Sequence, residues 1–377
     1  MNNERLRKLQ EIGQSVWIDS LSRAEIDNGS LERMIEDGVV GVTSNPTIFQ
    51  KAISASSLYD EQLQELSQKL DDPKEIFWEL ASTDIRNACD LLMPVFERTD
   101  RLDGYVSLEV SPDVAYDTPR TVEEAMHLHE LVDRPNLLVK IPATLPGLAA
   151  IEEMTAMGKS INVTLIFSLS RYRAVAGAYF RGLQRLVADG GDPSGVASVA
   201  SFFVSRVDTE ADKRLDEVGR EDLKGRLAIE NAKLAYEEFE RIFSGGDWEF
   251  LEAKGATKQR PLWASTSTKN PDRRDVIYVE NLIGPNTVNT MPASTLEATM
   301  DHAEIRPTLE GDADDARRFL EDLWEAGVSY EEVVEVLEKE GVQKFAEAFE
   351  ELTAFTIMIE PASGSRSARR SHGHRRW

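Results

Sequence analysis

Short apolar runs alternate with longer amphipathic segments along most of the chain. Strands of a parallel sheet, which are buried on both faces, read as continuous stretches of Val, Ile and Leu, whereas half-exposed strands alternate between apolar and polar residues. The richest runs here are of the continuous kind, so we predict eight short buried strands. They cover residues 15–20, 39–45, 105–110, 137–143, 161–168, 199–204, 261–266 and 276–282.

The segments between these runs have the period of helices. Residues 74–98 gather their apolar side chains near one face, and residues 225–243 do the same. Ser168 or Ser170 is suited to cap a helix that the glycines at 190–191 would end. Beyond residue 290 we predict no further strand but three helices, near 313–326, 330–340 and 343–358.

This order of elements predicts a closed (β/α)8 TIM barrel with additional C-terminal helices. A doubly wound open sheet is the alternative, but no predicted strand is followed by a G-x-G-x-x-G or P-loop signature. The sequence contains no internal repeat, and no Pro/Gly-rich linker interrupts it before about residue 360. We therefore expect residues 1–360 to form one domain.

The net charge of −24 is unevenly distributed along the chain. Residues 361–377 hold five arginines and no acid, which leaves −29 on residues 1–360. A body this acidic repels the phosphates of nucleic acid, so we predict no nucleic-acid partner. The basic segment 361–377 has the Ser, Gly and Arg composition of a disordered, solvated tail, although contact with nucleic acid or a membrane surface is an alternative for it.

Other features narrow the class of protein further. No apolar run approaches the roughly 20 residues of a membrane span, and the first residues lack the apolar core of a secretory signal. Cys89 is the single cysteine, which excludes an internal disulfide and a cysteine-based metal cluster. The five histidines show no ligand spacing either. We therefore expect a cytoplasmic protein with no membrane partner and no metal.

Polar residues stand at or near the C-terminal end of each predicted strand. In a TIM barrel these ends meet at one rim, which carries the active site. Each residue alone could be a helix cap, a turn starter or a half-buried strand residue, but their convergence at one mouth favours a functional site. They are Asp19, Asn45, Glu109, Lys140, Asn162, Thr164, Ser201, Ser265, Glu280 and Asn281.

Lys140 stands in LLVKIPAT (137–144), inside an apolar run where a charge is costly to bury. One interpretation is an ion pair with Asp19 or Glu109 that holds the rim together. The other is a nucleophile, because burial and nearby cations favour the neutral amine of a lysine. Such an amine attacks a carbonyl and forms a Schiff base after loss of water. Carboxylates and hydroxyls on the neighbouring strands suit this class I aldolase chemistry.

Several longer motifs resemble the transaldolase family, in its longer bacterial type. They are GVTSNPTIF (41–49), LLVKIPAT (137–144), INVTLIFS (161–168), ASFFVSRVD (200–208) and RPLWASTSTKNP…YVENLIGPNTVNTMP (260–292). The resemblance covers roughly residues 1–358, and the motifs occur in family order. It implies a cofactor-free (β/α)8 barrel that transfers a dihydroxyacetone unit between sugar phosphates.

The resemblance also implies catalytic roles. Lys140 matches the Schiff-base lysine, and Asp19 matches the aspartate that takes the proton from the C4 hydroxyl. Glu109 matches the glutamate that works through a water during imine formation and hydrolysis. Thr164 matches the threonine that positions this water.

Substrate-binding roles are implied in the same way. Asn45 and Asn162 match asparagines that hold the oxygens of the bound three-carbon unit, and Ser201 matches the serine beside its terminal hydroxyl. Arg206 matches the phosphate-binding arginine, whose guanidinium suits a bidentate contact.

The segment after the seventh strand departs from the family pattern. Shorter transaldolases carry a second arginine there, whereas this chain reads ASTSTKN. The second phosphate contact is therefore left open among Lys269, Ser265 and Ser267.

The resemblance predicts a transaldolase, with sedoheptulose 7-phosphate or fructose 6-phosphate as donor and glyceraldehyde 3-phosphate or erythrose 4-phosphate as acceptor. Two alternatives remain: a lyase that cleaves fructose 6-phosphate to free dihydroxyacetone, and a non-catalytic sugar-phosphate-binding barrel. Glu109 and the long helical C-terminus favour transaldolase over the lyase, and the joint presence of Lys140, Asp19, Glu109 and Thr164 argues against a mere sensor. We expect sugar phosphates as the partners, and a monomer or a homodimer.

Overall fold

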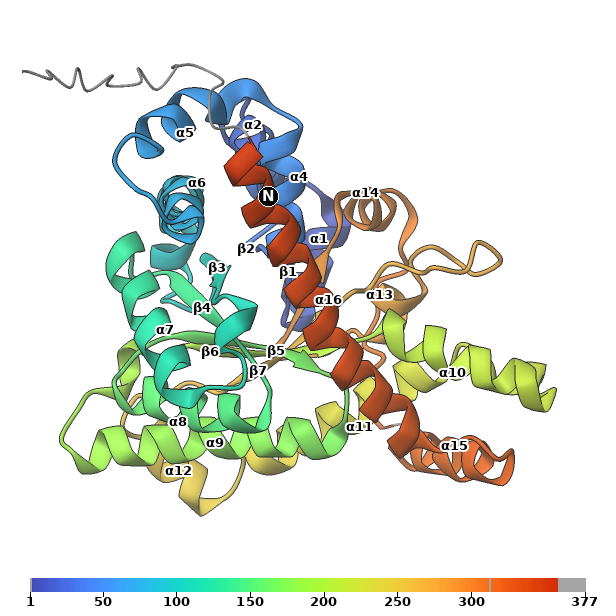
Figure 1. The fold of residues 1–377 in the computed structure, drawn as a ribbon. Helices are drawn as coiled ribbons and strands as arrows, with labels where there is room; N and C mark the ends of the chain where they lie inside the picture. Colours follow the sequence, from blue (N-terminus) through green and yellow to red (C-terminus); the bar gives the residue numbers. More distant parts are fainter. Residues whose placement is uncertain (1, 312, 359–377) are drawn as a thin grey trace, which may run out of the picture.

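A closed barrel of eight parallel strands forms the centre of the computed structural model, which describes residues 2–311 and 313–358. The strands follow one another in chain order, and β8 closes the barrel by pairing with β1. The predicted (β/α)8 TIM barrel is therefore confirmed (Figure 1). The strands are β1 (Gln14–Ile18), β2 (Gly41–Thr43), β3 (Tyr105–Glu109), β4 (Leu137–Pro142), β5 (Ile161–Ile166), β6 (Ser198–Phe203), β7 (Arg260–Ala264) and β8 (Thr287–Met291).

Helices occupy the connections between the strands and extend beyond the last one. Several begin at caps that the sequence marks: the Ser168 hydroxyl accepts a hydrogen bond from the Arg171 N–H at 3.1 Å, at the start of the predicted helix. The helices are α1 (Glu4–Ile12), α2 (Arg23–Asp27), α3 (Ser30–Asp37), α4 (Pro46–Ser54), α5 (Asp60–Leu66), α6 (Pro73–Arg98), α7 (Thr118–Val132), α8 (Leu145–Ala156), α9 (Leu169–Ala188), α10 (Ser205–Val218), α11 (Leu227–Ile242), α12 (Gly246–Glu252), α13 (Ile277–Asn281), α14 (Ala293–His302), α15 (Ala313–Glu325) and α16 (Tyr330–Met358).

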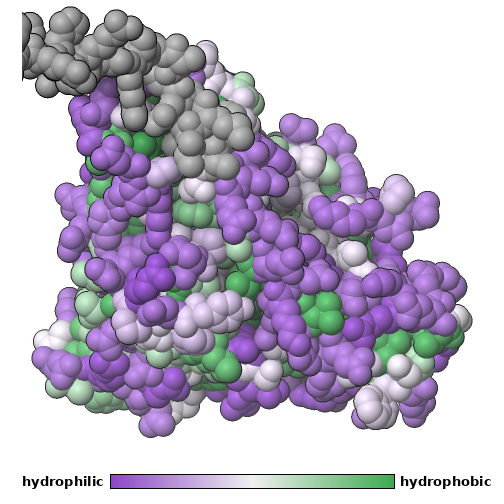
Figure 2. All heavy atoms as spheres, in the orientation of Figure 1, coloured by the Kyte–Doolittle hydropathy of each residue, from purple (hydrophilic) through white to green (hydrophobic). Residues whose placement is uncertain are grey.

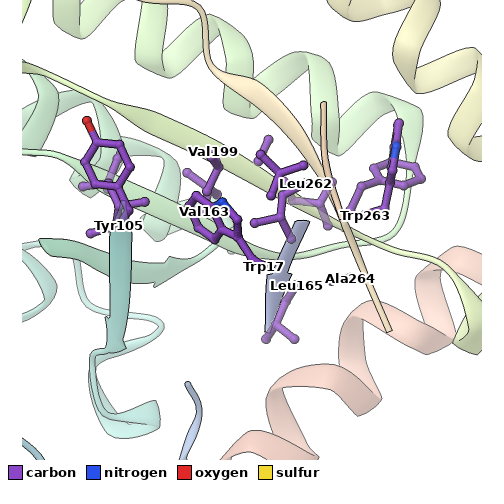
Figure 3. Packing of buried hydrophobic residues seen from close by; sticks show 14 of the residues in the cluster. Trp17, Tyr105, Val163, Leu165, Val199, Leu262, Trp263 and Ala264 are labelled. Atoms are coloured by element: carbon purple, nitrogen blue, oxygen red, sulfur yellow. The ribbon is translucent and has the colours of Figure 1, made fainter. Parts of the chain in front are cut away.

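Burial on both faces explains the continuous apolar runs of the strands. Every residue of β1 to β5, β7 and β8 is buried, and in β6 only Phe203 is partly exposed. Figure 3 shows part of the resulting hydrophobic cluster, with Trp17, Val163 and Leu262 projecting from the strands. On the seventh strand, Trp263 packs edge-on against Phe202 with ring centroids 6.1 Å apart.

The predicted position of the eighth strand is wrong. Residues 276–282 contain the short helix α13, and the strand is Thr287–Met291. This strand carries polar side chains that are nevertheless buried: Thr287 and Asn289 are 0% exposed. Gln14 donates to the Thr287 hydroxyl at 3.0 Å, and Thr266 donates to the Asn289 carbonyl oxygen at 2.9 Å. These hydrogen bonds satisfy the Thr287 hydroxyl and the Asn289 side-chain oxygen, although the Asn289 side-chain nitrogen has no partner among the described residues. Because the strand is buried with polar side chains, hydrophobicity does not mark it.

Residues 313–358 form two helices where the sequence predicts three, and α14, Ala293–His302, was not predicted. The predicted helices near 330–340 and 343–358 are one continuous helix, α16, which passes through Gly341. In Figure 1 this helix, in red, runs diagonally across the front of the molecule from α15 towards α4. Its outward surface is hydrophilic in Figure 2.

Contacts along its length hold α16 in place. The Tyr330 hydroxyl donates to Asn231 at 2.7 Å, and Glu338 pairs with Arg171 at 3.1 Å. Further along, Phe349 packs edge-on against Phe77 of α6, with ring centroids 5.7 Å apart. The helix therefore has a fixed course over the barrel.

A buried ion pair closes the end of the barrel at which the strands begin. Arg260 and Asp103 lie 2.9 Å apart, and Ser15 donates to the same carboxylate at 2.7 Å. A second Arg260 nitrogen donates to the Ser15 hydroxyl at 2.8 Å. These charges satisfy one another, which leaves the opposite rim for chemistry.

Two predictions concern the extent of the chain. The predicted basic tail, 361–377, lies outside the described residues. Within the described ranges, no helix combines the length and apolar character that crossing a bilayer requires.

Candidate active site

A cavity of about 390 Å³ lies at the rim where the strands end. Parallel strands bring their C-terminal ends to the same rim, so residues far apart in sequence meet there. Most of the predicted site residues line the cavity: Asp19, Asn45, Glu109, Lys140, Thr164, Ser201, Arg206, Ser265, Ser267 and Lys269. By contrast, Glu280 and Asn281 belong to α13 and do not line it.

Lys140 and Glu109 lie side by side on neighbouring strands. They are register partners in β3 and β4, and the Lys140 ammonium donates to Glu109 Oε2 at 3.1 Å and to the Ser44 carbonyl at 3.0 Å. Both residues are buried, with 7% and 5% of their surfaces exposed. A buried ion pair contributes little net stability, because desolvation offsets the attraction. Both the structural and the chemical interpretation of Lys140 share this contact, but only the chemical one requires that the amine face a cavity.

Asp19 follows β1 and faces the same cavity. Thr43 donates to Asp19 Oδ1 at 2.7 Å, and the Thr43 and Thr290 hydroxyls lie 2.7 Å apart. Burial raises the pKa of Asp19, although Lys140, Thr43 and Arg206 oppose the shift. Burial also raises the pKa of Glu109, with Lys140 opposing and Asp19 contributing in the same direction. Two carboxyl groups with raised pKa values are suited to accept and return protons.

Asn162 is another predicted site residue that does not line the cavity. It is fully buried, its amide nitrogen donates to the Ser107 hydroxyl at 3.0 Å, and its oxygen accepts from Ser201 at 2.7 Å. Ser201 does line the cavity. Asn162 therefore reaches the site through the hydroxyl that it orients.

Asn45 and Thr164 line the cavity and also belong to the framework of the barrel. The Asn45 side chain accepts from the Ile48 N–H at 3.0 Å and so caps α4 while it lines the cavity. Thr164 is 1% exposed and pairs with Pro142 in the sheet register, beyond Lys140. No hydrogen bond to its hydroxyl forms within the described ranges, which leaves this group for a ligand.

Two strained backbone positions flank the site. Leu165 (φ 60°) and Ser265 (φ 58°) adopt the left-handed conformation that non-glycine residues avoid. Leu165 coincides with a register irregularity between β5 and β6, from Val163 to Ile166. Both residues line the cavity, and strain of this kind clusters at functional sites.

The cavity collects positive charge in an acidic protein. Five cations line it against the two carboxylates Asp19 and Glu109, and they are Lys51, Lys140, Arg206, Lys269 and Lys344. In the described part of the chain, no acid lies within ion-pair distance of Arg206, Lys51 or Lys269. Arg206 packs over the Phe203 ring at 5.2 Å, and burial lowers its pKa. This arrangement suits an anionic ligand.

Comparison with known proteins agrees with this geometry. The model of the family described as "Transaldolase/Fructose-6-phosphate aldolase" matches residues 16–356. The chain belongs to this family. A protein of Acidothermus cellulolyticus named "Transaldolase" is 51% identical over 353 residues, which span 93% of this chain and 95% of the relative. A "Transaldolase" of Saccharopolyspora erythraea is 50% identical over 93% of this chain and 96% of its own length.

Sequence reasoning missed some of the residues that line the site of this family member. Thr43 and Thr290 follow no strand-end pattern that distinguishes them from ordinary strand threonines. Lys51 lies in α4 and Lys344 in α16, far from any strand end. Their positions depend on how these two helices pack over the rim, so local sequence carries no signal for them.

Among residues 2–311 and 313–358, no group of three or more His, Cys, Asp or Glu side chains is arranged to hold a metal ion.

Proposed function

We propose that this protein is a transaldolase that carries a dihydroxyacetone unit as a Schiff base on Lys140. The donor is a ketose phosphate, sedoheptulose 7-phosphate or fructose 6-phosphate, and the acceptor is glyceraldehyde 3-phosphate or erythrose 4-phosphate. The observation that carries the proposal is the buried Lys140 amine, which faces the cavity with a carboxylate 3.1 Å away. A cytoplasmic location and a monomeric or homodimeric state stay predictions of the sequence.

The first step joins the enzyme to the donor. The Lys140 amine attacks the C2 carbonyl, and the resulting carbinolamine loses water to give an iminium ion. In the proposed mechanism, Glu109 takes the proton from the amine and, through a water, returns it to the departing hydroxyl. Thr164 orients this water with its hydroxyl. Burial raises the pKa of Glu109, which favours the protonated form that this role requires.

Cleavage and transfer follow on the same lysine. Asp19 takes the proton from the C4 hydroxyl, the C3–C4 bond breaks, and its electron pair moves towards the iminium to give an enamine. The aldose phosphate leaves, an acceptor aldose phosphate takes its place, and the enamine carbon attacks the acceptor carbonyl while Asp19 returns the proton. Hydrolysis of the iminium then frees the new ketose and Lys140.

Substrate contacts are proposed for the remaining cavity residues. Asn45 and Ser201 hold the hydroxyls of the three-carbon unit, and Asn162 acts by orienting Ser201. Arg206 binds the phosphate, with Ser265 and Lys269 beside it.

Borohydride trapping tests the covalent step. Reduction in the presence of fructose 6-phosphate is expected to attach the three-carbon unit to the peptide that contains Lys140. Lys140→Ala should lose the adduct and the activity while keeping its unfolding temperature, whereas Lys8→Ala, a change on the exposed face of α1, should behave as wild type. An adduct on another lysine, or full activity in Lys140→Ala, would contradict the proposal.

Dependence on the acceptor separates transfer from cleavage. With fructose 6-phosphate alone, a transaldolase releases at most about one triose phosphate per active site, because the enamine waits for an acceptor. Adding erythrose 4-phosphate should then produce continuous turnover. Sustained release without erythrose 4-phosphate would indicate a lyase, and binding without any release would indicate a sensor.

A further inference from the structure

Lys344 reaches the cavity from a part of the chain that lies far from the strands in sequence. It lies in α16, which crosses the front of the barrel (Figure 1), and it lines the cavity together with Arg206 and Lys269. The loop after β7 supplies only Lys269, whose ammonium contacts the Ser267 hydroxyl at 3.4 Å. A phosphate dianion carries more charge than the Arg206 guanidinium neutralises, so a further cation at the rim would strengthen its binding.

Glu340 is the acidic partner of Lys344 on the same helix. Its carboxylate accepts from the Lys344 ammonium at 2.6 Å. The Lys344 contact lowers the pKa of Glu340, and Lys213 and Arg206 contribute more weakly in the same direction. Three acids raise the pKa of Arg206 against the effect of burial, and Glu340 contributes more than Asp19 or Glu109. Glu340 does not line the cavity and makes no ion pair with Arg206, so its direct partner at the rim is Lys344.

We propose that Lys344 is the second phosphate-binding residue, and that Glu340 is an internal counter-ion that the phosphate of the substrate displaces. A carboxylate and a phosphate offer the same hydrogen-bond acceptors to an ammonium and a guanidinium, but the phosphate carries more charge. The entering phosphate therefore binds Arg206 and displaces Glu340 from the Lys344 ammonium, and the half-exposed Glu340 carboxylate is then hydrated by solvent. This inference rests on the proposed function, because it assigns the phosphate of the same substrates.

An ordinary surface ion pair is the competing explanation. Glu340 and Lys344 stand four residues apart on a helix, and both are about half exposed, a combination that stabilises a helix slightly. The same helix offers a matched control, since Glu335 and Lys339 form an identical pair at 2.6 Å that does not line the cavity. A helix effect would appear in both pairs, whereas a phosphate effect would appear only in the first.

Steady-state kinetics with inorganic phosphate as competitor tests the assignment. In Lys344→Gln, we expect KM for fructose 6-phosphate and Ki for inorganic phosphate to rise about threefold to tenfold, with kcat unchanged. In Glu340→Gln, both constants should fall, because the competing carboxylate is gone. Lys339→Gln and Glu335→Gln should leave both constants at their wild-type values.

The outcomes distinguish the assignment from the proposed function. Borohydride trapping at Lys140 with saturating fructose 6-phosphate should persist in Lys344→Gln, whereas failure of trapping in the wild-type protein would refute the transaldolase mechanism itself. If Lys344→Gln changes KM and Ki no more than Lys339→Gln, the assignment is overturned. It is equally overturned if Lys51→Gln produces the rise and Lys344→Gln does not, since the anion would then lie at α4.

Discussion

At the scale of single residues, each charged group at the centre of the site has a polar partner. Lys140 and Glu109 contact each other at 3.1 Å, and Asp19 is held by Thr43. Each carboxyl has a raised pKa because burial outweighs the nearby cations. Buried carboxyl groups with shifted pKa values lower the stability of the fold but can transfer protons, so they cluster at functional sites.

Replacement of Glu109 by Gln tests the proton-transfer role. The amide keeps the size of the side chain but cannot carry the proton, so we expect kcat to fall by about 10²-fold to 10⁴-fold. Borohydride trapping with fructose 6-phosphate should become slow but still occur on Lys140. The acid limb of the pH profile of kcat that belongs to Glu109 should disappear in this variant. An unchanged kcat and pH profile would mean that Glu109 serves only as the counter-ion of Lys140.

Asp208 gives a prediction for stability against pH. Its carboxylate accepts from the Ala228 N–H and the Tyr278 hydroxyl, both at 2.8 Å, and burial raises its pKa to about 6. The folded state therefore holds this proton more tightly than the unfolded chain, so the stabilisation is complete below about pH 4 and is lost as the pH rises through 6.

The comparison variant is Asp208→Asn, which does not titrate. Relative to it, we expect the wild-type free energy of unfolding to fall by up to about 3 kcal/mol between pH 4 and pH 7, measured by urea denaturation. If the free energies of unfolding of the two proteins changed with pH in the same way, the pKa of Asp208 would not be raised in the folded state.

At the scale of elements, α16 turns an open barrel mouth into a partly covered cavity. The helix contributes Gly341, Lys344, Phe345 and Ala348 to the lining. It comes close to the strained segment after Thr164, because a Cβ at Gly341 would lie 3.1 Å from the Phe167 ring and 3.4 Å from Leu165. Glycine at this position lets the helix approach the rim.

Alanine at Gly341 tests this close approach. Gly177, inside α9, is the matched control, since its Cβ would meet only the flexible end of Arg181. The free energy of unfolding should rise by about 0.5–1 kcal/mol in Gly177→Ala, because alanine has the higher helix propensity. The free energy of unfolding of Gly341→Ala should be lower than that of Gly177→Ala by about 1–3 kcal/mol, because Phe167 is buried and cannot move aside. The KM of Gly341→Ala should also rise, because α16 shifts away from the rim. Equal gains in thermal unfolding would contradict the close packing.

At the scale of the whole molecule, an acidic protein concentrates cations at one mouth. The net charge is −24, yet five cations and two carboxylates line the cavity. The outer charges repel anions in general, while the local cations attract a phosphate that enters the mouth. Substrate binding therefore depends on short-range charge and not on the overall field.

Ionic strength tests this balance. Between 50 and 500 mM salt, we expect KM for fructose 6-phosphate to rise about twofold to fivefold, because the rim cations are partly exposed and become screened. Unphosphorylated fructose, turned over at high concentration, should show no such rise. A salt effect of equal size for both sugars would indicate a change in the protein and not in phosphate binding.

The sequence by itself determined the barrel, most of its strands and the polar residues at their ends. These features are local: apolar runs report burial, caps report helix starts, and strand ends converge wherever parallel strands form a barrel. The eighth strand was misplaced because Thr287 and Asn289 are polar residues whose burial depends on partners elsewhere in the chain. Only the tertiary structure decided that α16 crosses the mouth and that Lys51 and Lys344 join the site. The path of a helix over the barrel is set by long-range packing, such as Phe349 against Phe77, which local sequence patterns do not encode.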